Sequence, residues 1–134
     1  MTTVVIILGM LVLPVFPQDE PPTTGDTSKL SDAIAEWIRK AEQGDVDAQF
    51  HVGFMYNVGE GVPQDQKEAA KWYRLAAKQN DAWAQNNLGV LYVEGEGVPK
   101  NYRMARKWFA AAAQHDADAL SNLNWLNEEL GRPV

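Results

Sequence analysis

The sequence predicts an all-α protein, a short right-handed solenoid of antiparallel helical hairpins. Two observations carry this prediction: a repeat of 36 residues, and apolar stripes of helical spacing in both halves of the repeat. Residues 45–80 and 81–116 have the same residue at 15 of 36 aligned positions. A period of this length is typical of supersecondary units that stack side by side. Stacked units present an extended surface, so we expect binding along that surface rather than in one deep pocket.

Composition limits both the size and the partners of the protein. The chain of 134 residues has room for one domain. Its net charge is −6, and its 12 basic residues are outnumbered by 18 acids and spread among them. Nucleic-acid binding needs a basic stripe, so we predict no nucleic-acid partner and no anionic membrane surface as the main target. The absence of cysteine excludes disulfides, thiol catalysis and Cys-based zinc sites.

The N-terminal segment differs from the rest of the chain. Residues 4–16 are almost wholly apolar and too few to span a bilayer, which takes about 20 residues. We predict that residues 1–17 are a signal peptide that exports the protein to the periplasm or beyond the cell. An uncleaved N-terminal anchor in the inner membrane is the alternative. A buried helix or strand is less favoured, because the Pro-, Thr- and Asp-rich residues 18–30 predict a flexible linker.

The second half of each repeat predicts an amphipathic helix, and a helix of the same type precedes the first full repeat. The apolar residues recur at i, i+3, i+4 and i+7, which is helical spacing. The stripes are Ile34, Trp37, Ile38 and Ala41; Ala69, Trp72, Tyr73, Ala76 and Ala77; and Ala105, Trp108, Phe109, Ala112 and Ala113. The predicted helices lie near 31–43, 66–79 and 102–114, with Ser31, Asp65 and Asn101 as N-caps.

The first half of each repeat also predicts a helix, and a third copy closes the chain. These helices are expected near 46–58, 82–94 and 117–130, the first two capped by Asp45 and Asp81. Gly53 and Gly89 fall inside the first two, where glycine costs about 1 kcal/mol relative to alanine. We therefore expect the backbone of a neighbouring helix to come close at both glycines. Asn124 takes this position in the third copy, as suits a terminal helix.

A Gly-x-Gly-Val-Pro segment joins the two halves of each repeat. Gly59 and Gly95 are expected to end the preceding helices in the left-handed conformation. Pro63 and Pro99 cannot continue a helix. Residues 131–134 are expected to form a C-terminal tail, because glycine and proline stop the last helix.

This pattern resembles the Sel1-like repeat family. The residues that carry the resemblance are Ala48, Val52, Gly53, Tyr56, Gly59, Gly61, Val62, Pro63, Ala69, Trp72, Ala76 and Ala77, then Ala84, Leu88, Gly89, Tyr92, Gly95, Gly97, Val98, Pro99, Ala105, Trp108, Ala112 and Ala113. It covers about residues 31–130, with full repeats near 45–80 and 81–116 and partial ones at 31–44 and 117–130. The resemblance implies a solenoid related to tetratricopeptide arrays and a role in protein–protein interaction, often as a bacterial adaptor in signalling, secretion or the cell envelope. Some exported relatives are cysteine-rich, and this chain is not.

Candidate binding residues are those that differ between the copies of the first helix. In arrays of this kind the first helices are expected to line the concave side. The predicted groove residues are Phe50, Phe54, Asn57, Asn86, Val90, Val93, Ser121 and Trp125. Phe54, Val90 and Trp125 stand at equivalent positions and are called the apolar row below. Exposed aromatic residues in a groove are typical anchors for a peptide or helix. The alternative is that these side chains pack between neighbouring helices.

The sequence predicts no catalytic residue, no metal site and no cofactor. His51 and His115 lie in helices of different type and lack ligand-like spacing, and no nucleophile motif or phosphate-binding loop occurs. We therefore predict a non-catalytic module that binds a protein or peptide. A cell-wall-directed hydrolase or small-ligand-binding protein is the alternative function. A homo-oligomer with Trp83 or Trp125 at its contact is a third possibility.

Overall fold

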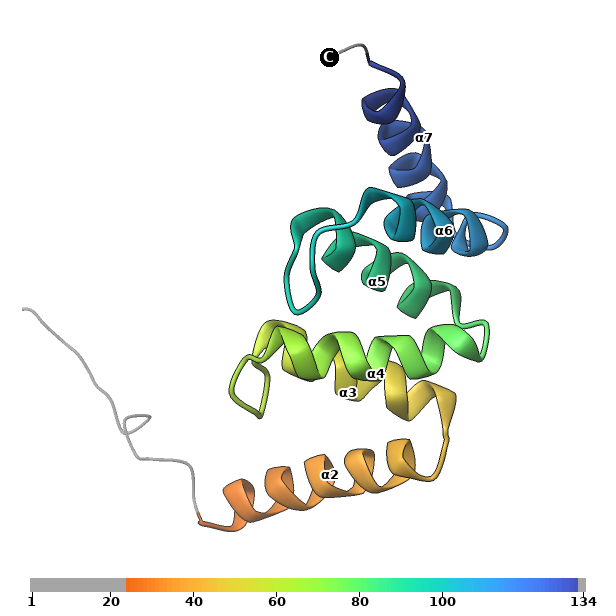
Figure 1. Ribbon diagram of the computed structural model, residues 1–134. Helices are drawn as coiled ribbons and strands as arrows, with labels where there is room; N and C mark the ends of the chain where they lie inside the picture. Colours follow the sequence, from red (N-terminus) through yellow and green to blue (C-terminus); the bar gives the residue numbers. More distant parts are fainter. Residues whose placement is uncertain (1–23, 133–134) are drawn as a thin grey trace, which may run out of the picture. The chain divides into compact units, whose positions relative to one another are not determined.

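The structure is a computed structural model in which residues 24–132 are described. This part of the chain contains six α-helices and no strand, as the sequence predicts. They are α2 (Thr24–Glu42), α3 (Val46–Val58), α4 (Gln66–Lys78), α5 (Ala82–Glu94), α6 (Tyr102–Ala112) and α7 (Ala117–Gly131), labelled as in Figure 1. The chain divides between Ala33 and Ile34 into two compact units, and the second unit holds the repeats.

Two helical hairpins make up the full repeats. The first hairpin is α3 with α4, and the second is α5 with α6. Helix α4 also packs on α5, and α6 packs on α7, so each helix of unit two from α3 onward lies against the next one in the chain. The result is the all-α repeat solenoid that the 36-residue period predicts.

Side-chain caps begin the helices of the repeats where the sequence predicts them. The carboxylate of Asp45 accepts a hydrogen bond from the backbone N–H of Ala48 at 2.8 Å, and Asp81 accepts from Ala84 at 2.8 Å. Asp65 and Asn101 cap α4 and α6 in the same way. Each cap satisfies an N–H group that the helix itself leaves without an acceptor.

The start of α2 differs from the prediction. The helix begins at Thr24, so Ser31 lies inside it and is not its N-cap, and residues 24–30 are helical where a linker was expected. The last proline before the helix is Pro22. No residue between it and Ser31 is barred from a helix, so the polar composition of this stretch was a weak reason to predict a linker. The signal peptide predicted at 1–17, the rest of the linker and residues 133–134 lie outside the described residues.

In each hairpin one glycine in the left-handed conformation ends the first helix. Gly59 has φ 76° and Gly95 has φ 73°, and their N–H groups bond the carbonyls of Met55 and Leu91 at 2.8 Å. Gly97 has a separate reason to be glycine. A Cβ at that position would overlap the carbonyl oxygen of Gln66, so the second turn lies directly against the start of α4.

The mid-helix glycines make room for an aromatic ring from the second helix of the same hairpin. A Cβ on Gly53 would lie 2.7 Å from Cδ1 of Tyr73, and a Cβ on Gly89 would lie 2.5 Å from Cε1 of Phe109. A neighbouring helix does come close at both glycines, but the prediction that its backbone makes the approach is wrong, because the approaching group is a side chain. Tyr73 and Phe109 are 0% and 1% exposed, and they fill the space that glycine leaves.

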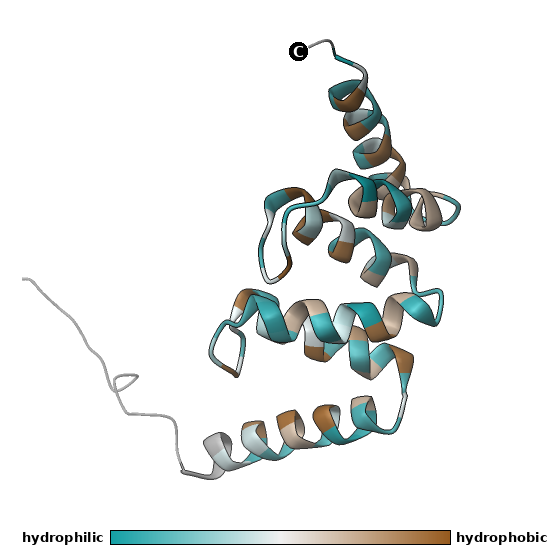
Figure 2. Ribbon diagram, in the orientation of Figure 1, coloured by the Kyte–Doolittle hydropathy of each residue, from teal (hydrophilic) through white to brown (hydrophobic). Residues whose placement is uncertain are grey.

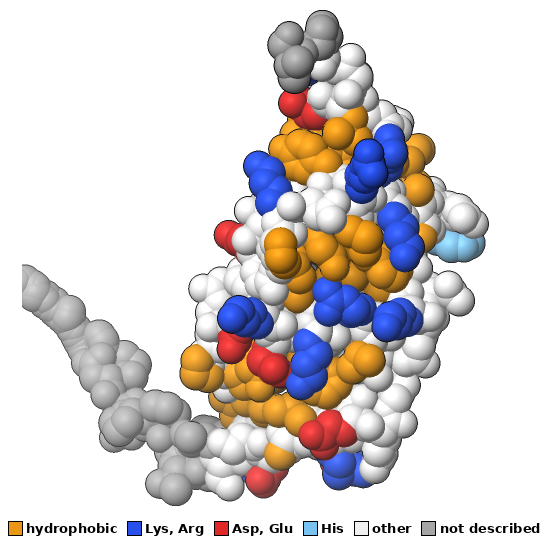
Figure 3. All heavy atoms as spheres, viewed as in Figure 1, with side chains coloured by type: hydrophobic (Ala, Val, Ile, Leu, Met, Phe, Trp, Pro, Cys, Tyr) orange, Lys and Arg blue, Asp and Glu red, His pale blue; other side chains and the backbone are white. Residues whose placement is uncertain are grey.

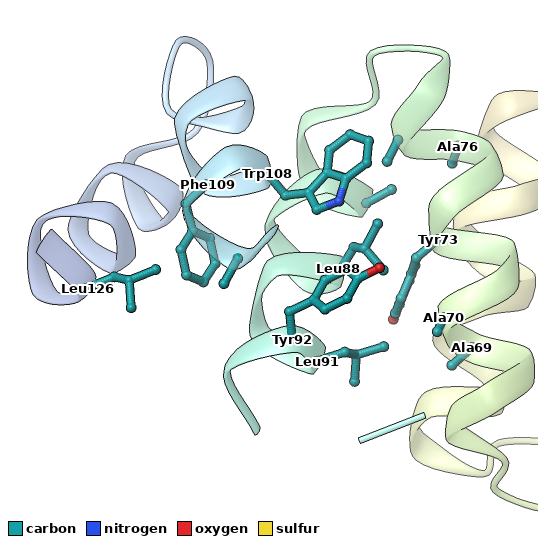
Figure 4. Close-up of a cluster of buried hydrophobic side chains, with 13 residues drawn as sticks. Ala69, Ala70, Tyr73, Ala76, Leu88, Leu91, Tyr92, Trp108, Phe109 and Leu126 are labelled. Atoms are coloured by element: carbon teal, nitrogen blue, oxygen red, sulfur yellow. The ribbon is translucent and has the colours of Figure 1, made fainter. Parts of the chain in front are cut away.

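The hydrophobic core consists of two clusters. The larger cluster joins α4, α5, α6 and α7 around Tyr73, Leu88, Phe109 and Leu126, which follow one another across Figure 4 from Leu126 through Phe109 and Leu88 to Tyr73. The smaller cluster is Ala41, Ala48, Val52 and Trp72, from the last turn of α2, α3 and α4. Figure 2 shows that α2 carries its hydrophobic and hydrophilic residues on opposite sides. Within residues 24–132, no helix has the length and apolarity that crossing a membrane requires.

Candidate partner-binding surface

The apolar row contains two exposed aromatic residues and one packed valine. Phe54 on α3 is 40% exposed and Trp125 on α7 is 42% exposed. Val90, between them in the repeat alignment, is half-buried and packs against the larger core cluster, as does Val93. The packing alternative therefore holds for Val90 and Val93, whereas Phe54 and Trp125 are exposed and their place in a groove stays a prediction. The two large aromatic side chains keep apolar surface in contact with water.

Phe50 belongs to an aromatic cluster that links α3 with its neighbours. Its ring centroid lies 5.9 Å from that of Tyr73 and 5.9 Å from that of Trp83 at the start of α5. His51, the next residue, lies 4.7 Å from the ring of Trp37 on α2. These distances are typical of favourable aromatic pairs. Phe50 thus acts partly as packing, whereas Trp83 remains 64% exposed.

Asparagine side chains connect two of the first-type helices, which are the helices that form the first half of each repeat copy: α3, α5 and α7. Asn122 on α7 donates from Nδ2 to Oδ1 of Asn86 on α5 at 2.9 Å. Ser121, which the repeat alignment makes the equivalent of Asn86, is exposed. Asn122, the next residue, is the one whose side chain reaches α5. Asn86 is therefore held in place by an interhelical hydrogen bond.

A polar spot lies between α3 and α5 around the hydroxyl of Tyr73. This hydroxyl is buried and has no hydrogen-bond partner of acceptable geometry among the described residues. Burial raises the pKa of Tyr73, and the nearby side chains of Asn87 and Asn57 offset part of that rise. Asn57 and Asn87 are both half-buried. The predicted groove residue Asn57 thus stands beside a buried polar atom rather than in an apolar wall.

Two buried glutamines are structural residues that the sequence reasoning missed. Gln49 and Gln85 are 4% and 5% exposed, and each donates from Nε2 to a backbone carbonyl at 3.1 Å. The acceptors are Ala41 at the end of α2 and Ala77 at the end of α4. A helix end leaves such carbonyls without an intrahelical partner. The sequence offered one sign of this role, because the same residue, glutamine, recurs at an offset of 36.

The basic residues are gathered, which corrects the expectation that they are spread among the acids. Helices α4 and α6 carry seven of them and a single acid, Glu68. They are Lys67, Lys71, Arg74, Lys78, Arg103, Arg106 and Lys107. Figure 3 shows Lys and Arg side chains between hydrophobic ones on the face over these helices. Lys71 and Lys107 lie 5.0 and 5.1 Å from the ring centroids of Trp72 and Trp108. Helices α4 and α6, the second-type helices that form the second half of each repeat, therefore present cations in a chain whose net charge is negative.

The described residues offer little for catalysis. Residues 24–132 contain no group of three or more His, Cys, Asp or Glu side chains that could hold a metal ion. His51 lies against Trp37, and His115 lies on the turn before α7. The turn acids Glu94 and Glu96 interact with each other: burial first, and then the charge of Glu96, raises the pKa of Glu94. The absence of a catalytic set, a metal and a cofactor stays a prediction.

A family model for the Sel1 repeat matches the chain at residues 46–81 and 84–116. These two matches together span more than half of the chain. The chain belongs to the Sel1 repeat family. Sel1 repeat proteins are generally protein-interaction modules, and the two matches correspond to the two hairpins described above.

Solved structures of other Sel1 repeat proteins are similar to this one. A Sel1 repeat protein from Oxalobacter formigenes is 43% identical, with a TM-score of 0.65 over 68% of this chain and 38% of that chain. A protective antigen of uropathogenic Escherichia coli strains, which displays an SLR fold, is 38% identical, with a TM-score of 0.68 over 70% of this chain and 20% of that chain. This chain thus spans well under half the length of either relative.

A third structure extends the fold comparison to a protein of similar size. Helicobacter pylori cysteine-rich protein B is 23% identical, with a TM-score of 0.56 over 72% of this chain and 96% of that chain. At this identity the likeness concerns the fold alone. No curated protein matches the chain.

Proposed function

We propose that this Sel1 repeat protein is a non-catalytic interaction module of the bacterial cell envelope or exterior. It binds a peptide or protein along the first-type helices α3, α5 and α7. The observation that carries the proposal is the exposure of Phe54 and Trp125 at equivalent repeat positions. The scaffold positions of the same helices, such as Val52, Leu88 and Leu126, are fully buried. In typical interfaces a few side chains supply most of the binding energy, and tryptophan and tyrosine are frequent among them.

Polar groups beside the apolar row would fix the orientation of the partner. Asn57 and Asn87 lie beside the buried hydroxyl of Tyr73, and Asn86 is held by Asn122. A carboxamide that is already held in place loses little conformational freedom when a ligand binds. These side chains offer donors and acceptors next to apolar anchors, the composition expected of a peptide-binding surface.

The proposed location rests on the N-terminal sequence. Residues 4–16 have the length and apolarity of the hydrophobic region of a signal peptide. We propose export to the periplasm or beyond, with attachment to the inner membrane only if this segment is retained. N-terminal sequencing of the mature protein tests the proposal. A mature chain that begins after the apolar segment supports export, whereas a cytosolic product that starts at Met1 contradicts it.

Affinity capture from the native envelope fraction tests the binding surface. The wild-type protein and the Phe54→Ala/Trp125→Ala variant are compared for a reproducible protein partner. Each truncated anchor is expected to weaken binding by about tenfold, because hot-spot residues contribute roughly 1–2 kcal/mol or more. Leu75→Ala is the matched control. The exposed fraction of Leu75, 39%, is nearly the same as that of Phe54, but Leu75 lies on α4 and not on a first-type helix. Equal recovery of the partner by all three proteins would contradict the proposed surface.

A further inference from the structure

The open end of a hairpin is the end opposite the turn that joins its two helices. In the first hairpin a glutamine side chain bridges this end. Here the last turn of α4 lies beside the first turn of α3. Nε2 of Gln79 donates to the carbonyl oxygen of Gly44 at 3.1 Å and to Oε1 of Gln49 at 2.9 Å. The carboxamide of Gln79 therefore satisfies two acceptors that belong to the preceding turn and to α3.

The second hairpin presents the same two acceptors. Asn80 has φ 71°, in the left-handed region like Gly44 with φ 97°, and each donates its N–H to the carbonyl three residues earlier at 3.0 Å. Gln85, like Gln49, donates from Nε2 to the carbonyl eight residues earlier at 3.1 Å. The turn and the glutamine therefore make the same hydrogen bonds in both hairpins. The carbonyl of Asn80 corresponds to that of Gly44, and Oε1 of Gln85 corresponds to Oε1 of Gln49.

In the second hairpin a hollow takes the place of the closing side chain. Among the described residues, no hydrogen bond reaches the Asn80 carbonyl or Oε1 of Gln85. A hollow of about 360 Å³ is found here. Its lining residues are Asn80, Gln85, Ala111, Gln114 and His115. We call it the open-end hollow.

Two sequence differences between the hairpins account for the open-end hollow. The chain is one residue shorter between Ala112 and Asp116 than in the first hairpin, so Gln114 and His115 share the place of Gln79 without reproducing its bonds. Ala111 also stands 36 residues after Leu75, so a small side chain replaces a large one. Both changes remove atoms from the same end of the hairpin.

The surroundings of the hollow also contain donors and apolar surface. Gln114 offers a side-chain amide and His115 a ring nitrogen. His115 also borders a shallower hollow of about 270 Å³, which is lined by Asp81, Ala82 and Trp83. Trp83 is the most exposed of the large hydrophobic side chains in the described residues, at 64%. A ligand that extends from the open-end hollow past His115 therefore reaches a tryptophan ring in the adjoining hollow.

We propose that the open-end hollow binds the side-chain carboxamide of a glutamine in a partner peptide. The NH₂ group donates to the Asn80 carbonyl and to Oε1 of Gln85, as Gln79 does in the first hairpin. The carbonyl oxygen of the bound amide accepts from Gln114 or His115, and the peptide chain lies against Trp83. A lysine ammonium could meet the two acceptors but offers no acceptor to Gln114 or His115, whose donors would stay bonded to water. This subsite is separate from the apolar row and does not depend on it.

An NMR titration of the full chain with short peptides tests the proposal. The probes are acetyl-Gly-Gln-Gly-N-methylamide and two peptides of the same form with methionine or lysine in the centre. The glutamine peptide is expected to shift the side-chain amide of Gln85 and the backbone amides of Asn80 and His115. The variant Ala111→Leu, which restores the large residue of the first hairpin, is expected to weaken binding at least tenfold. Ala111→Met is a second filling variant, and circular dichroism checks that both remain folded.

The reciprocal change in the first hairpin provides the matched control. The double variant Gln79→Ala/Leu75→Ala frees the acceptors on Gly44 and Gln49 and also removes the large side chain beside them, so the glutamine peptide is expected to gain a second site that shifts the side-chain amide of Gln49. The proposal is overturned if the methionine or lysine peptide binds as tightly as the glutamine peptide. It is also overturned if the glutamine peptide leaves Gln85 unshifted, including the case in which Gln114 itself turns into the hollow. Failure of the envelope capture would not affect these outcomes.

Discussion

The two hairpins have the same scaffold and different ends and faces. In both, an aromatic ring fills the space over a mid-helix glycine, a buried glutamine bonds the end of the preceding second-type helix, and a left-handed glycine ends the first helix. The first hairpin places a tyrosine over its glycine and closes its open end with Gln79. The second places a phenylalanine there and leaves a hollow.

This comparison separates residues that build the repeat from residues that are free to bind. Most positions that match at an offset of 36 are buried, cap a helix or hold a turn, and the exposed pair Lys71 and Lys107 is an exception. Positions that differ, such as Phe54 and Val90 or Leu75 and Ala111, decide how much apolar surface and how much space each hairpin offers. A solenoid tolerates such differences because each unit contacts only its neighbours.

The largest expected effect comes from the shared part of the scaffold. Gly53→Val and Gly89→Val should each destabilise the fold by about 3 kcal/mol, because the added atoms overlap Tyr73 and Phe109 in a filled core. Thermal or urea unfolding measures the change. Asn124→Val is the matched control, since Asn124 is the exposed equivalent in α7 and should cost about 0.5 kcal/mol or less. Similar losses at all three positions would contradict the assigned role of the glycines.

Exchanging the two aromatic residues should have a smaller effect of opposite sign. Phe109→Tyr adds a hydroxyl to an apolar site and should destabilise by about 2 kcal/mol, the cost of a buried polar group without a partner. Tyr73→Phe removes a buried hydroxyl that has no well-formed hydrogen bond and should be neutral or stabilise by up to about 1 kcal/mol. Urea unfolding of both variants measures the difference. A large loss in Tyr73→Phe would show that Asn57 and Asn87 bond the hydroxyl firmly.

Much of the fold follows from the sequence because the scaffold positions are repeated. The caps of the repeat helices and five of the six helices lie within two residues of their predicted positions. Crowding at the mid-helix glycines was predicted, but the aromatic rings that cause it were not. The start of α2 was wrong because polar residues without proline are compatible with either helix or linker. Exposure along the apolar row could not be predicted, because it depends on how each helix is rotated against its neighbours. The hollow depends on a one-residue deletion and one small side chain, whose effects appear only when the two open ends are compared.

The smallest expected effect concerns the turns of the two hairpins. Glu94 precedes the second turn, and Val58 is its equivalent in the first. Burial and the charge of Glu96 raise the pKa of Glu94 above its ordinary value of 4.5, so the folded state holds this proton more tightly than the unfolded state. Stability from this group is therefore lost as the pH rises from about 4.5 through the raised value. Glu94→Gln should stabilise by about 0.3 kcal/mol at pH 7 and by nothing at pH 4, measured by urea unfolding at both values. If the variant is also more stable than the wild type at pH 4, the gain in stability comes from packing and not from the charge of Glu94.

The division between scaffold and binding residues is tested most directly by titrating the captured partner into purified protein. Calorimetry is run on the wild type and on Phe54→Ala/Trp125→Ala, with the melting temperature of each recorded alongside. We expect the affinity to fall at least a hundredfold, the product of two tenfold losses, while the melting temperature falls no more than in the Leu75→Ala control. An unchanged affinity, or a loss of melting temperature comparable to that of Gly89→Val, would show that these aromatic residues serve the fold rather than the partner.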